Sequence, residues 1–326
     1  MTLVSLRSLL EARQVAIYFA AVALAGLVAW QWPASTAMAP AVNPLLAFML
    51  FVTFLQVPLT ELRRALSNVR FLGVLLLANF VAVPVLVAVL LPWVPQDPLL
   101  RVGVLLVLLT PCIDYVVTFA HLGKADAKPL LASTPLLLAA QMVLLPVYLS
   151  LFMGDAAAGL VQWEPFVHAF IWLIAVPLSL AAVCQAWAAR LATGERVVGW
   201  LGLLPVPATA AVLFVVVASV APQLGLALDA VRQVAAVYVV FAIAAPVLGW
   251  CVARMCRLPA DQGRAVAFSS ATRNSLVVLP LGLAIPGAVP WVPAVIVTQT
   301  LVELVSELVY VKVAPNLGAK AVRQAS

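Results

Sequence analysis

Apolar side chains run along the whole length of this chain with little interruption. Of its 326 residues, 65% are hydrophobic and 9% are charged, and the mean hydropathy is +1.15. A soluble domain has about 25% charged residues, so a water-exposed surface cannot be built from this sequence. The apolar runs are long and continuous, whereas an outer-membrane barrel would show short alternating segments. The sequence therefore predicts an all-α integral membrane protein with several transmembrane helices.

Ten membrane spans can be drawn on the chain. Residues 1–14 are too polar for a cleavable signal, and the apolar run after them is full length, so we expect a retained first span. The predicted spans are 15–32, 43–60, 70–91, 98–120, 128–152, 165–189, 197–220, 231–253, 264–286 and 290–312.

The basic residues fix the expected orientation. If the N-terminus is cytoplasmic, only Arg101 and Arg232 fall outside and Arg273 lies within a span. The remaining basic residues all fall inside: Arg7, Arg13, Arg63, Arg64, Arg70, Lys124, Lys128, Arg190, Arg196, Arg254, Arg257, Arg264, Lys312, Lys320 and Arg323. The positive-inside rule therefore predicts a multi-pass protein of the plasma membrane (a bacterial inner membrane) with both termini cytoplasmic. It also explains the net charge of +6 without a nucleic-acid partner.

The two halves of the chain share one layout. The fourth span opens with Arg101 and reaches a Thr-Pro-Cys sequence at 110–112, and the ninth opens with Arg264 and reaches Thr-Arg-Asn-Ser at 272–275. Five spans per half is an odd number, so the second half must be inverted in the membrane. Interrupted helices in corresponding positions of inverted repeats mark the substrate site of secondary transporters. We predict one membrane domain made of two inverted five-helix repeats, 1–160 and 161–326, in which broken helices four and nine cross.

Polar residues at these two breaks form the predicted substrate site. They are Thr110, Pro111, Cys112, Asp114, Thr272, Arg273, Asn274 and Ser275. A charge at the centre of a span costs at least about 2.5–3.5 kcal/mol, so Asp114 and Arg273 each need a partner or a function. If the broken spans cross, the two residues form a buried pair or share a cavity through water. A proline kink with an acid near the cytoplasmic mouth, and a purely structural ion pair, are the alternatives.

Three further polar residues lie in spans five and ten. Glu303 and Glu307 are four apart and share one helix face, where like charges favour a shared proton or a bound cation. The repeat pairs Gln141 in span five with the neighbourhood of Glu303. We predict ion coupling by Asp114, Glu303, Glu307 and Gln141, with H⁺ favoured over Na⁺. Snorkelling of Glu307 and helix packing of Gln141 are the alternatives.

The cysteines show no zinc-type spacing, and no metal site or cofactor is expected. Cys184, Cys251 and Cys256 read as inert thiols in or beside apolar spans. Cys112 differs because it stands beside a helix break, two residues from Asp114. Its thiol is either a soft ligand for a thiophilic metalloid or a packed bystander.

The segment "TPCIDYVVTFAHLGKAD" (residues 110–126) resembles the arsenite permeases of the bile acid:sodium symporter and arsenite transporter superfamily. The shared features are the Pro-Cys pair in the fourth of ten spans and the Gly-Lys turn after it. The resemblance implies a core of spans 3–5 and 8–10 that moves against a panel of spans 1–2 and 6–7. It also places Cys112 at the cysteine of those permeases.

The chain departs from that pattern in the ninth span. Ser275 stands where those permeases have a glutamate, Arg273 is additional, and Asp114 adds an acid in the fourth span. Arsenous acid is largely neutral at physiological pH and does not need a fixed guanidinium, whereas an anionic substrate would use one.

The leading hypothesis is a secondary transporter that exports arsenite or antimonite in exchange for protons. A proton- or sodium-coupled carrier of a small organic anion, with Arg273 as charge partner, is the second hypothesis. An integral-membrane enzyme is remote, because His121 and His168 fall on opposite sides of the membrane and no catalytic pair is evident. A receptor would not explain broken helices at symmetric depths, and no ATP-binding loop is present. The expected partners are the lipid bilayer and the transported solute, with a homodimer as one possible assembly.

Overall fold

The structure is a computed structural model that describes residues 3–56, 68–154, 164, 167–168, 170–224, 227–283 and 285–318. These residues fold into helices, and eight of the helices they form are long and apolar enough to cross a membrane. The protein is therefore a multi-pass membrane protein. Two further segments, α6–α7 and α15–α16, are interrupted helices and are not among the eight.

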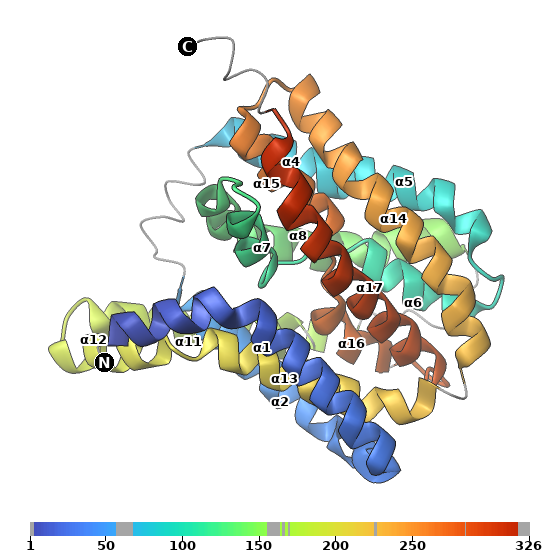
Figure 1. Cartoon of the computed structure of the whole chain (residues 1–326), viewed down its shortest axis with the longest axis horizontal. Coiled ribbons are helices and arrows are strands. Elements are labelled where there is room, and N and C mark those ends of the chain that lie inside the picture. Colours follow the sequence, from blue (N-terminus) through green and yellow to red (C-terminus); the bar gives the residue numbers. More distant parts are fainter. Residues whose placement is uncertain are drawn as a thin grey trace.

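One group of helices packs around α13 (Pro205–Leu224) and is called the panel group below. Helix α1 (Leu3–Gln31) runs alongside α13, which also packs on η1 (Pro33–Ala41) and α2 (Val42–Phe54). Helix α11 (Val176–Ala188), which continues η4 (Phe170–Ala175), packs on α2 and on α12 (Ala192–Leu201). In Figure 1 these helices form the lower layer of the molecule.

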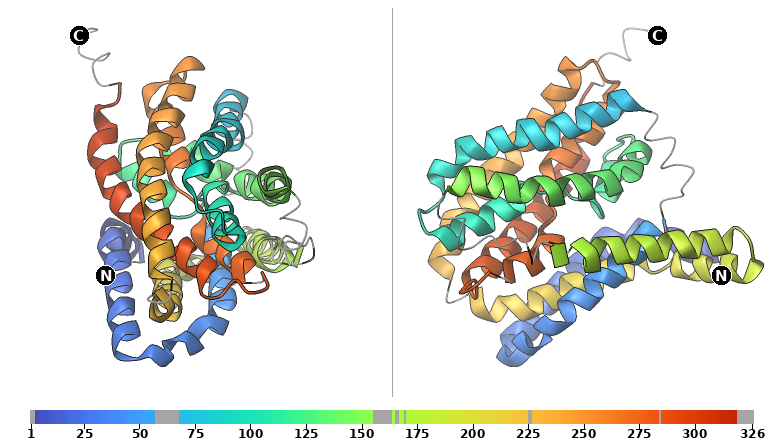
Figure 2. Two further views of the ribbon diagram at one scale, coloured as in Figure 1. Left: turned by 90° about the vertical axis from the view of Figure 1, so that its right-hand side faces the viewer. Right: turned by 180° about the vertical axis from the view of Figure 1, so that it is seen from behind.

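The remaining helices form the core group, which lies above the panel group in Figure 1 and in the right-hand view of Figure 2. Helix α14 (Leu228–Met255) packs on α15 (Ala260–Ala271) and on α17 (Trp291–Val313), and α17 also packs on α6 (Pro98–Leu108) and α16 (Ser275–Leu283). The group also holds α4 (Val69–Leu77), η2 (Ala78–Ala82), α5 (Val83–Leu90), η3 (Leu91–Trp93), α7 (Val116–Leu122), α8 (Ala127–Met153) and η5 (Ala314–Asn316).

Short sequence signals set the ends of the core helices. Asp97 caps α6, because its carboxylate accepts hydrogen bonds from the N–H groups of Leu99 (2.9 Å) and Leu100 (3.1 Å). Pro84 has no N–H to offer to the carbonyl of Phe80, which accepts the hydroxyl of Tyr148 instead (2.5 Å). The turn before Pro84 widens into the π-helix η2, where the Val83 N–H donates to the carbonyl of Ala78. This bulge turns Asn79 into the interior.

The predicted helix breaks are confirmed, because α6 ends at Leu108 and α7 begins at Val116, while α15 ends at Ala271 and α16 begins at Ser275. Several predicted span ends are wrong. The first helix begins at Leu3 instead of residue 15, since polar residues extend it beyond the apolar run. The seventh predicted span divides into α12 and α13. The ends of spans two and six at 57–60, 165–166 and 169, and residue 284 of span nine, lie outside the described residues. The inverted relation of 1–160 to 161–326 stays a prediction.

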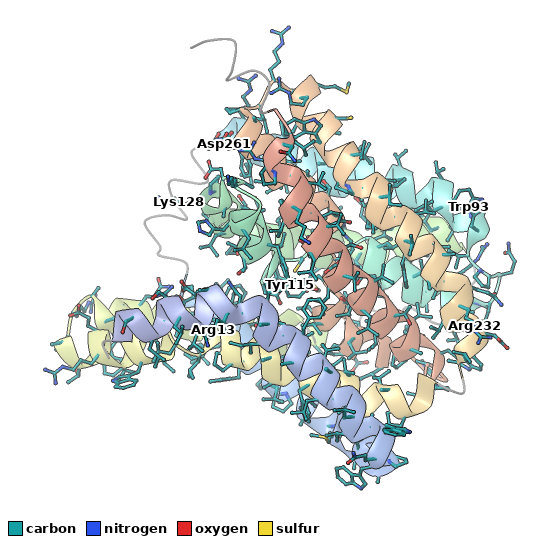
Figure 3. All side chains as sticks on the ribbon, in the orientation of Figure 1. Arg13, Trp93, Tyr115, Lys128, Arg232 and Asp261 are labelled. Atoms are coloured by element: carbon teal, nitrogen blue, oxygen red, sulfur yellow. The ribbon has the colours of Figure 1, made fainter. Side chains whose placement is uncertain are left out.

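Labelled charged residues lie on two opposite sides of the molecule (Figure 3). Figure 3 labels Arg13, Lys128 and Asp261 in the left half of the view, and Trp93 and Arg232 at the right. We call the side with Lys128 the basic end. Its assignment to the cytoplasm remains the expectation of the positive-inside rule.

Candidate functional site

The first break contains Pro111. Proline has no N–H for the carbonyl of Val107, which accepts the N–H of Thr110 instead (3.2 Å). The Thr110 hydroxyl donates to the carbonyl of Leu106 (2.8 Å). The next N–H group, that of Cys112, turns away from its own helix and donates to the carbonyl of Thr272 in the second break (3.0 Å). The proline therefore ends α6 and directs the chain toward the other interrupted helix.

The second break forms the reciprocal hydrogen bond to the first. The N–H of Asn274 donates to the carbonyl of Thr110 (2.9 Å), so Pro111 and Arg273 form an antiparallel bridge. The N–H of Arg273 donates to Oε2 of Glu303 (2.6 Å). The prediction that residues 110–114 contact 272–275 is confirmed. The bonds between the two breaks satisfy these backbone groups inside the protein, as membrane depth requires.

The guanidinium of Arg273 is fully buried (0% exposed) among oxygen atoms. Nη1 donates to the carbonyl of Leu108 (3.3 Å), and Nη2 donates to the carbonyl of Ser269 (2.5 Å) and to Oδ1 of Asn79 (3.0 Å). The ring of Phe241 covers the group, with its centroid 5.6 Å from Cζ. All three hydrogen-bond acceptors are neutral.

The predicted pair between Asp114 and Arg273 is wrong. Within the described residues, the guanidinium forms no ion pair with Asp114 or any other carboxylate. Oδ1 of Asp114 instead accepts hydrogen bonds from the Cys112 thiol (2.9 Å) and the Tyr115 N–H (2.6 Å). The backbone bridge fixes the two residues on different sides, so their side chains do not meet.

Glu303 is the best-satisfied carboxylate in the interior. Besides the Arg273 N–H, it accepts hydrogen bonds from the Tyr115 hydroxyl at Oε1 (2.5 Å) and the Gln299 amide at Oε2 (2.6 Å). Three donors favour the ionised form of a carboxylate. Glu303 is therefore tied to Arg273 through the main chain of that residue and not through its guanidinium.

Glu307 has a different environment. Its Oε1 lies 2.5 Å from the hydroxyl of Thr272, which also donates to the carbonyl of Phe268 (2.7 Å). A hydroxyl has one proton to donate, so the contact between Thr272 and Glu307 is best satisfied when Glu307 carries a proton. Its Oε2 has no partner among the described residues. Snorkelling is excluded in this structure, because Glu307 is 0% exposed.

A cavity of about 580 Å³ lies between the panel and core groups. Its walls come from α1, the end of α2, the first break and α7, the start of α8, and the start of α13 with the segment before it. The polar and charged lining residues are Arg7, Ser8, Glu11, Gln14, Tyr18, Thr53, Gln56, Asp114, Tyr115, Thr118, His121, Lys128 and Thr209. The cavity extends from Lys128 at the basic end to Asp114 and Tyr115 at the first break. Figure 3 shows Tyr115 between the two helix groups.

Asp114 is the only predicted site residue that lines this cavity. Its Oδ2 is buried and has no partner among the described residues, so one oxygen of the carboxylate at the cavity's inner end lacks a hydrogen bond. Cys112 is 1% exposed and does not line the cavity, and its thiol donates to Asp114. Asp114 therefore separates the thiol from any solute in the cavity.

The remaining predicted residues lie buried in the core group. Gln141, Asn274 and Ser275 each hold a side-chain polar atom with no partner among the described residues. The Gln141 side chain forms no hydrogen bond to Glu303 among the described residues, and their predicted pairing by the repeat stays a prediction.

Tyr115 and Asn79 are site residues that the sequence reasoning missed. Tyr115 links the cavity to Glu303, and Asn79 holds the guanidinium of Arg273. Asn79 is an amide within the apolar run "LLLANFVAV", which is a usable signal, since an amide in a span needs an internal partner. Tyr115 gave no such signal beyond its place next to Asp114.

The two interrupted helices are also joined at the basic end. The N–H of Asp126 donates to the carbonyl of Asp261 (3.0 Å), and Nε of Arg264 donates to the carbonyl of Lys124 (2.8 Å). Burial, and secondarily the negative charge of Asp261, raise the pKa of Asp126 above its usual range. These bonds tie α15 to the turn before α8, so the two interrupted helices are held as one unit.

One comparison with known proteins identifies a family. A model of the sodium bile acid symporter family matches residues 43–225, which is more than half of the chain. The matched range includes the first break and ends before the second. No curated protein matches the chain.

Proposed function

The chain belongs to the sodium bile acid symporter family, and from this we propose that it is a secondary transporter coupling a proton at Asp114 to movement of a small organic anion. Members of the family are transporters, which agrees with a multi-pass membrane protein that is not an enzyme. The family name suggests sodium as the coupling ion, and the proton is our proposal for this chain.

The observation that carries the proposal is the cavity that ends at Asp114. Its volume of about 580 Å³ lies within the range of about 300–1,000 Å³ typical of sites for small organic ligands. It reaches the point where two interrupted helices meet, and transporter substrate sites occupy that position.

The charges of the lining explain the coupling. Arg7 and Glu11 pair with each other (2.7 Å), and Lys128 and Asp114 are the other lysine and carboxylate of the lining. When Asp114 is ionised, these two charges cancel. When Asp114 carries a proton, the lining is positive and attracts an anion. Proton and anion therefore favour each other's binding, which is the requirement for symport.

In this proposal the residue that attracts the organic anion is not Arg273, the residue that the sequence suggested. Arg273 is sequestered in the core group, so Lys128 takes the role that the sequence suggested for Arg273. Under this proposal, the core group moves against the panel group in a ten-span inverted-repeat protein of the inner membrane, with both termini cytoplasmic. A homodimer stays a prediction.

Metalloid efflux is the second candidate, and one observation favours it. The Cys112 thiol lies 2.9 Å from Oδ1 of Asp114, so a rotation of Asp114 would expose a soft sulfur ligand at the end of the cavity. Arsenite or antimonite exchanged for protons would then use the same carboxylate.

The test uses purified protein in liposomes with proton and sodium gradients imposed separately. The probes are a panel of small mono- and dicarboxylic acids, and arsenite. We expect a proton gradient to drive uptake of at least one organic acid at zero sodium. Asp114→Asn should lose gradient-driven uptake but keep substrate exchange, whereas Asp97→Asn should transport normally because asparagine also caps a helix.

Three results would count against the proposal. Uptake driven only by sodium would reject proton coupling. Uptake of arsenite alone, lost in Cys112→Ser, would favour the second candidate. Unchanged proton-driven uptake in Asp114→Asn would remove Asp114 from the mechanism.

A further inference from the structure

Arg273 is buried in the core group without a carboxylate on its guanidinium, although a buried charge is costly unless it is paired or well hydrogen-bonded. We propose that its guanidinium is a built-in cation, occupying an oxygen site that the two helix breaks create for a small cation such as sodium. The contacts of Arg273 support the cation site itself. The consequence for the transport cycle rests on the proposed function.

The two carbonyls around the guanidinium are products of the breaks. In an unbroken α6, the carbonyl of Leu108 would accept the N–H of Cys112, four residues on. That N–H donates to Thr272 instead, and the carbonyl accepts Nη1 of Arg273 (3.3 Å). The first break therefore frees the carbonyl of Leu108 from its helical hydrogen bond, and Arg273 takes the place of the missing donor.

The second break repeats this pattern. In an unbroken α15, the carbonyl of Ser269 would accept the N–H of Arg273. That N–H donates to Glu303 (2.6 Å), and the carbonyl accepts Nη2 of the same arginine (2.5 Å). Both freed carbonyls belong to the last turn of a helix, where the helix dipole is negative and favours a cation.

Asn79 completes the site from a third element. Its amide donates to the carbonyl of Leu75 (3.0 Å) and to Oγ of Ser269 (2.9 Å), which fixes the orientation of the side chain. Oδ1 is thereby turned toward Arg273 and accepts Nη2 (3.0 Å). The π-helix η2 therefore places Asn79 where its Oδ1 can accept a hydrogen bond from Arg273.

The donor set is that of a cation site and not of an ion pair. Carbonyl and amide oxygens are the ligands of hard cations, and carbonyls of interrupted helices coordinate ions in transporters. The Phe241 ring, 5.6 Å from Cζ, adds the cation–π contact that suits a guanidinium. Because the guanidinium is covalently part of the protein, it would replace one cation that would otherwise have to bind and dissociate in each transport cycle.

The first test does not depend on transport. Arg273→Ala and Arg273→Gln are purified in detergent, and their melting temperatures are measured in sodium, low-millimolar guanidinium or choline chloride at equal ionic strength. We expect the melting temperature in choline to fall by about 5 °C or more. Sodium or guanidinium should restore most of that loss, because each can occupy the vacated oxygen site.

Two controls separate this effect from general destabilisation. Arg232→Ala removes an exposed arginine, 71% exposed and 3.9 Å from Asp229, and should show no cation-specific recovery. Arg273→Ala combined with Asn79→Ala should lose the recovery, because one oxygen of the site is gone. If Arg273→Ala shows no selective recovery, or recovers equally in the double variant, the proposal is overturned.

The second test adds transport in liposomes. Wild type should transport equally in sodium and choline, and Arg273→Ala should transport only with sodium or guanidinium present. Sodium-dependent wild type together with cation-rescued stability of Arg273→Ala would reject proton coupling but keep the cation site. Proton-driven wild type with no rescue of Arg273→Ala by any cation would reject the cation site but keep the proposed function.

Discussion

Tyr115 joins the cavity to the buried carboxylates through a single hydroxyl. That hydroxyl donates to Glu303 at 2.5 Å, while the residue itself lines the cavity. This bond connects the cavity lining directly to Glu303. Its removal leaves a buried acceptor with one donor fewer, which costs about 1–3 kcal/mol.

We therefore predict that Tyr115→Phe lowers the transport rate at least about tenfold, the equivalent of about 1.4 kcal/mol. Tyr148→Phe is the matched control, because its hydroxyl donates to the carbonyl of Phe80 (2.5 Å) outside the cavity. Initial uptake rates in liposomes measure both variants. Equal rates for the two variants would show that the Tyr115 hydroxyl has no special role.

Because the side chains of Asp114 and Arg273 do not meet, we predict that substitutions at the two residues change the free energy of unfolding independently. Losses of stability in Asp114→Asn and Arg273→Gln should add within about 0.5 kcal/mol in a double-mutant cycle. Asn79→Ala and Arg273→Gln share a hydrogen bond (3.0 Å) and should couple by about 0.5–3 kcal/mol. Thermal unfolding of the single and double variants measures both cycles. A strong coupling between Asp114 and Arg273 would mean that they pair in solution.

At the residue scale, the sequence indicated which residues are unusual but not which of them meet. Pro111, Asp114 and Arg273 stand out because each is costly in an apolar span. Their partners depend on which way each side chain turns at the bridge, and the sequence carries no local signal for that. The expected pair of opposite charges was wrong because two backbone carbonyls and the amide oxygen of Asn79 accept the hydrogen bonds of the guanidinium instead.

At the scale of elements, glycine sets the approach of α14 to α15. A Cβ on Gly249 would lie 2.8 Å from Cβ of Ser270 and 3.0 Å from the carbonyl of Val266, both on α15. This contact holds α15, and with it the second break, against α14. Small residues at helix interfaces allow such close packing in membranes.

Gly249→Ala should therefore lower stability by about 1–3 kcal/mol, as overpacking does. Gly73→Ala is its matched control, since Gly73 lies in α4 with nothing within 4 Å of a new Cβ. The control should be neutral or stabilising by up to about 1 kcal/mol, because alanine favours a helix. Melting temperatures in detergent compare the two, and a loss of similar size in both would contradict the packing explanation.

The elements themselves were largely predictable, because long apolar runs cross the membrane and prolines or polar runs interrupt them. The break positions came from the placement of Pro111 and of "SSATRNS" within otherwise apolar spans. Helix ends were less predictable. Helix α1 begins at Leu3, and its first turns contain polar residues such as Arg7 and Glu11, which pair along the helix (2.7 Å). Hydropathy gives no signal for a helix in such a polar stretch.

At the scale of the whole molecule, one side-chain bond spans the two helix groups beside the cavity. The Thr118 hydroxyl on α7 donates to Oε1 of Gln14 on α1 (2.9 Å). If the core group moves against the panel group, this bond breaks during each cycle. A covalent link at the same place should stop transport.

We predict that Gln14→Cys with Thr118→Cys, joined by a short thiol cross-linker, abolishes uptake, and that cleavage of the linker restores it. Cys184, Cys251 and Cys256 are replaced by alanine beforehand. The control pair, Ser35→Cys with Ala218→Cys, joins η1 to α13 within the panel group, where Ser35 Oγ donates to the Ala218 carbonyl (2.7 Å). Normal uptake in the cross-linked Gln14–Thr118 pair would exclude movement between the groups at this contact.

Proton movement coupled to the substrate, recorded in the same liposomes, tests the central claim most directly. The lumen contains a pH-sensitive dye, both sides start at equal pH without sodium, and a transported organic acid from the panel is added outside as a fully ionised salt. We predict that the lumen acidifies with wild type and with Asp97→Asn, and that Asp114→Asn gives substrate exchange without acidification. Acidification that persists in Asp114→Asn, or that requires sodium in wild type, would contradict a proton carried by Asp114.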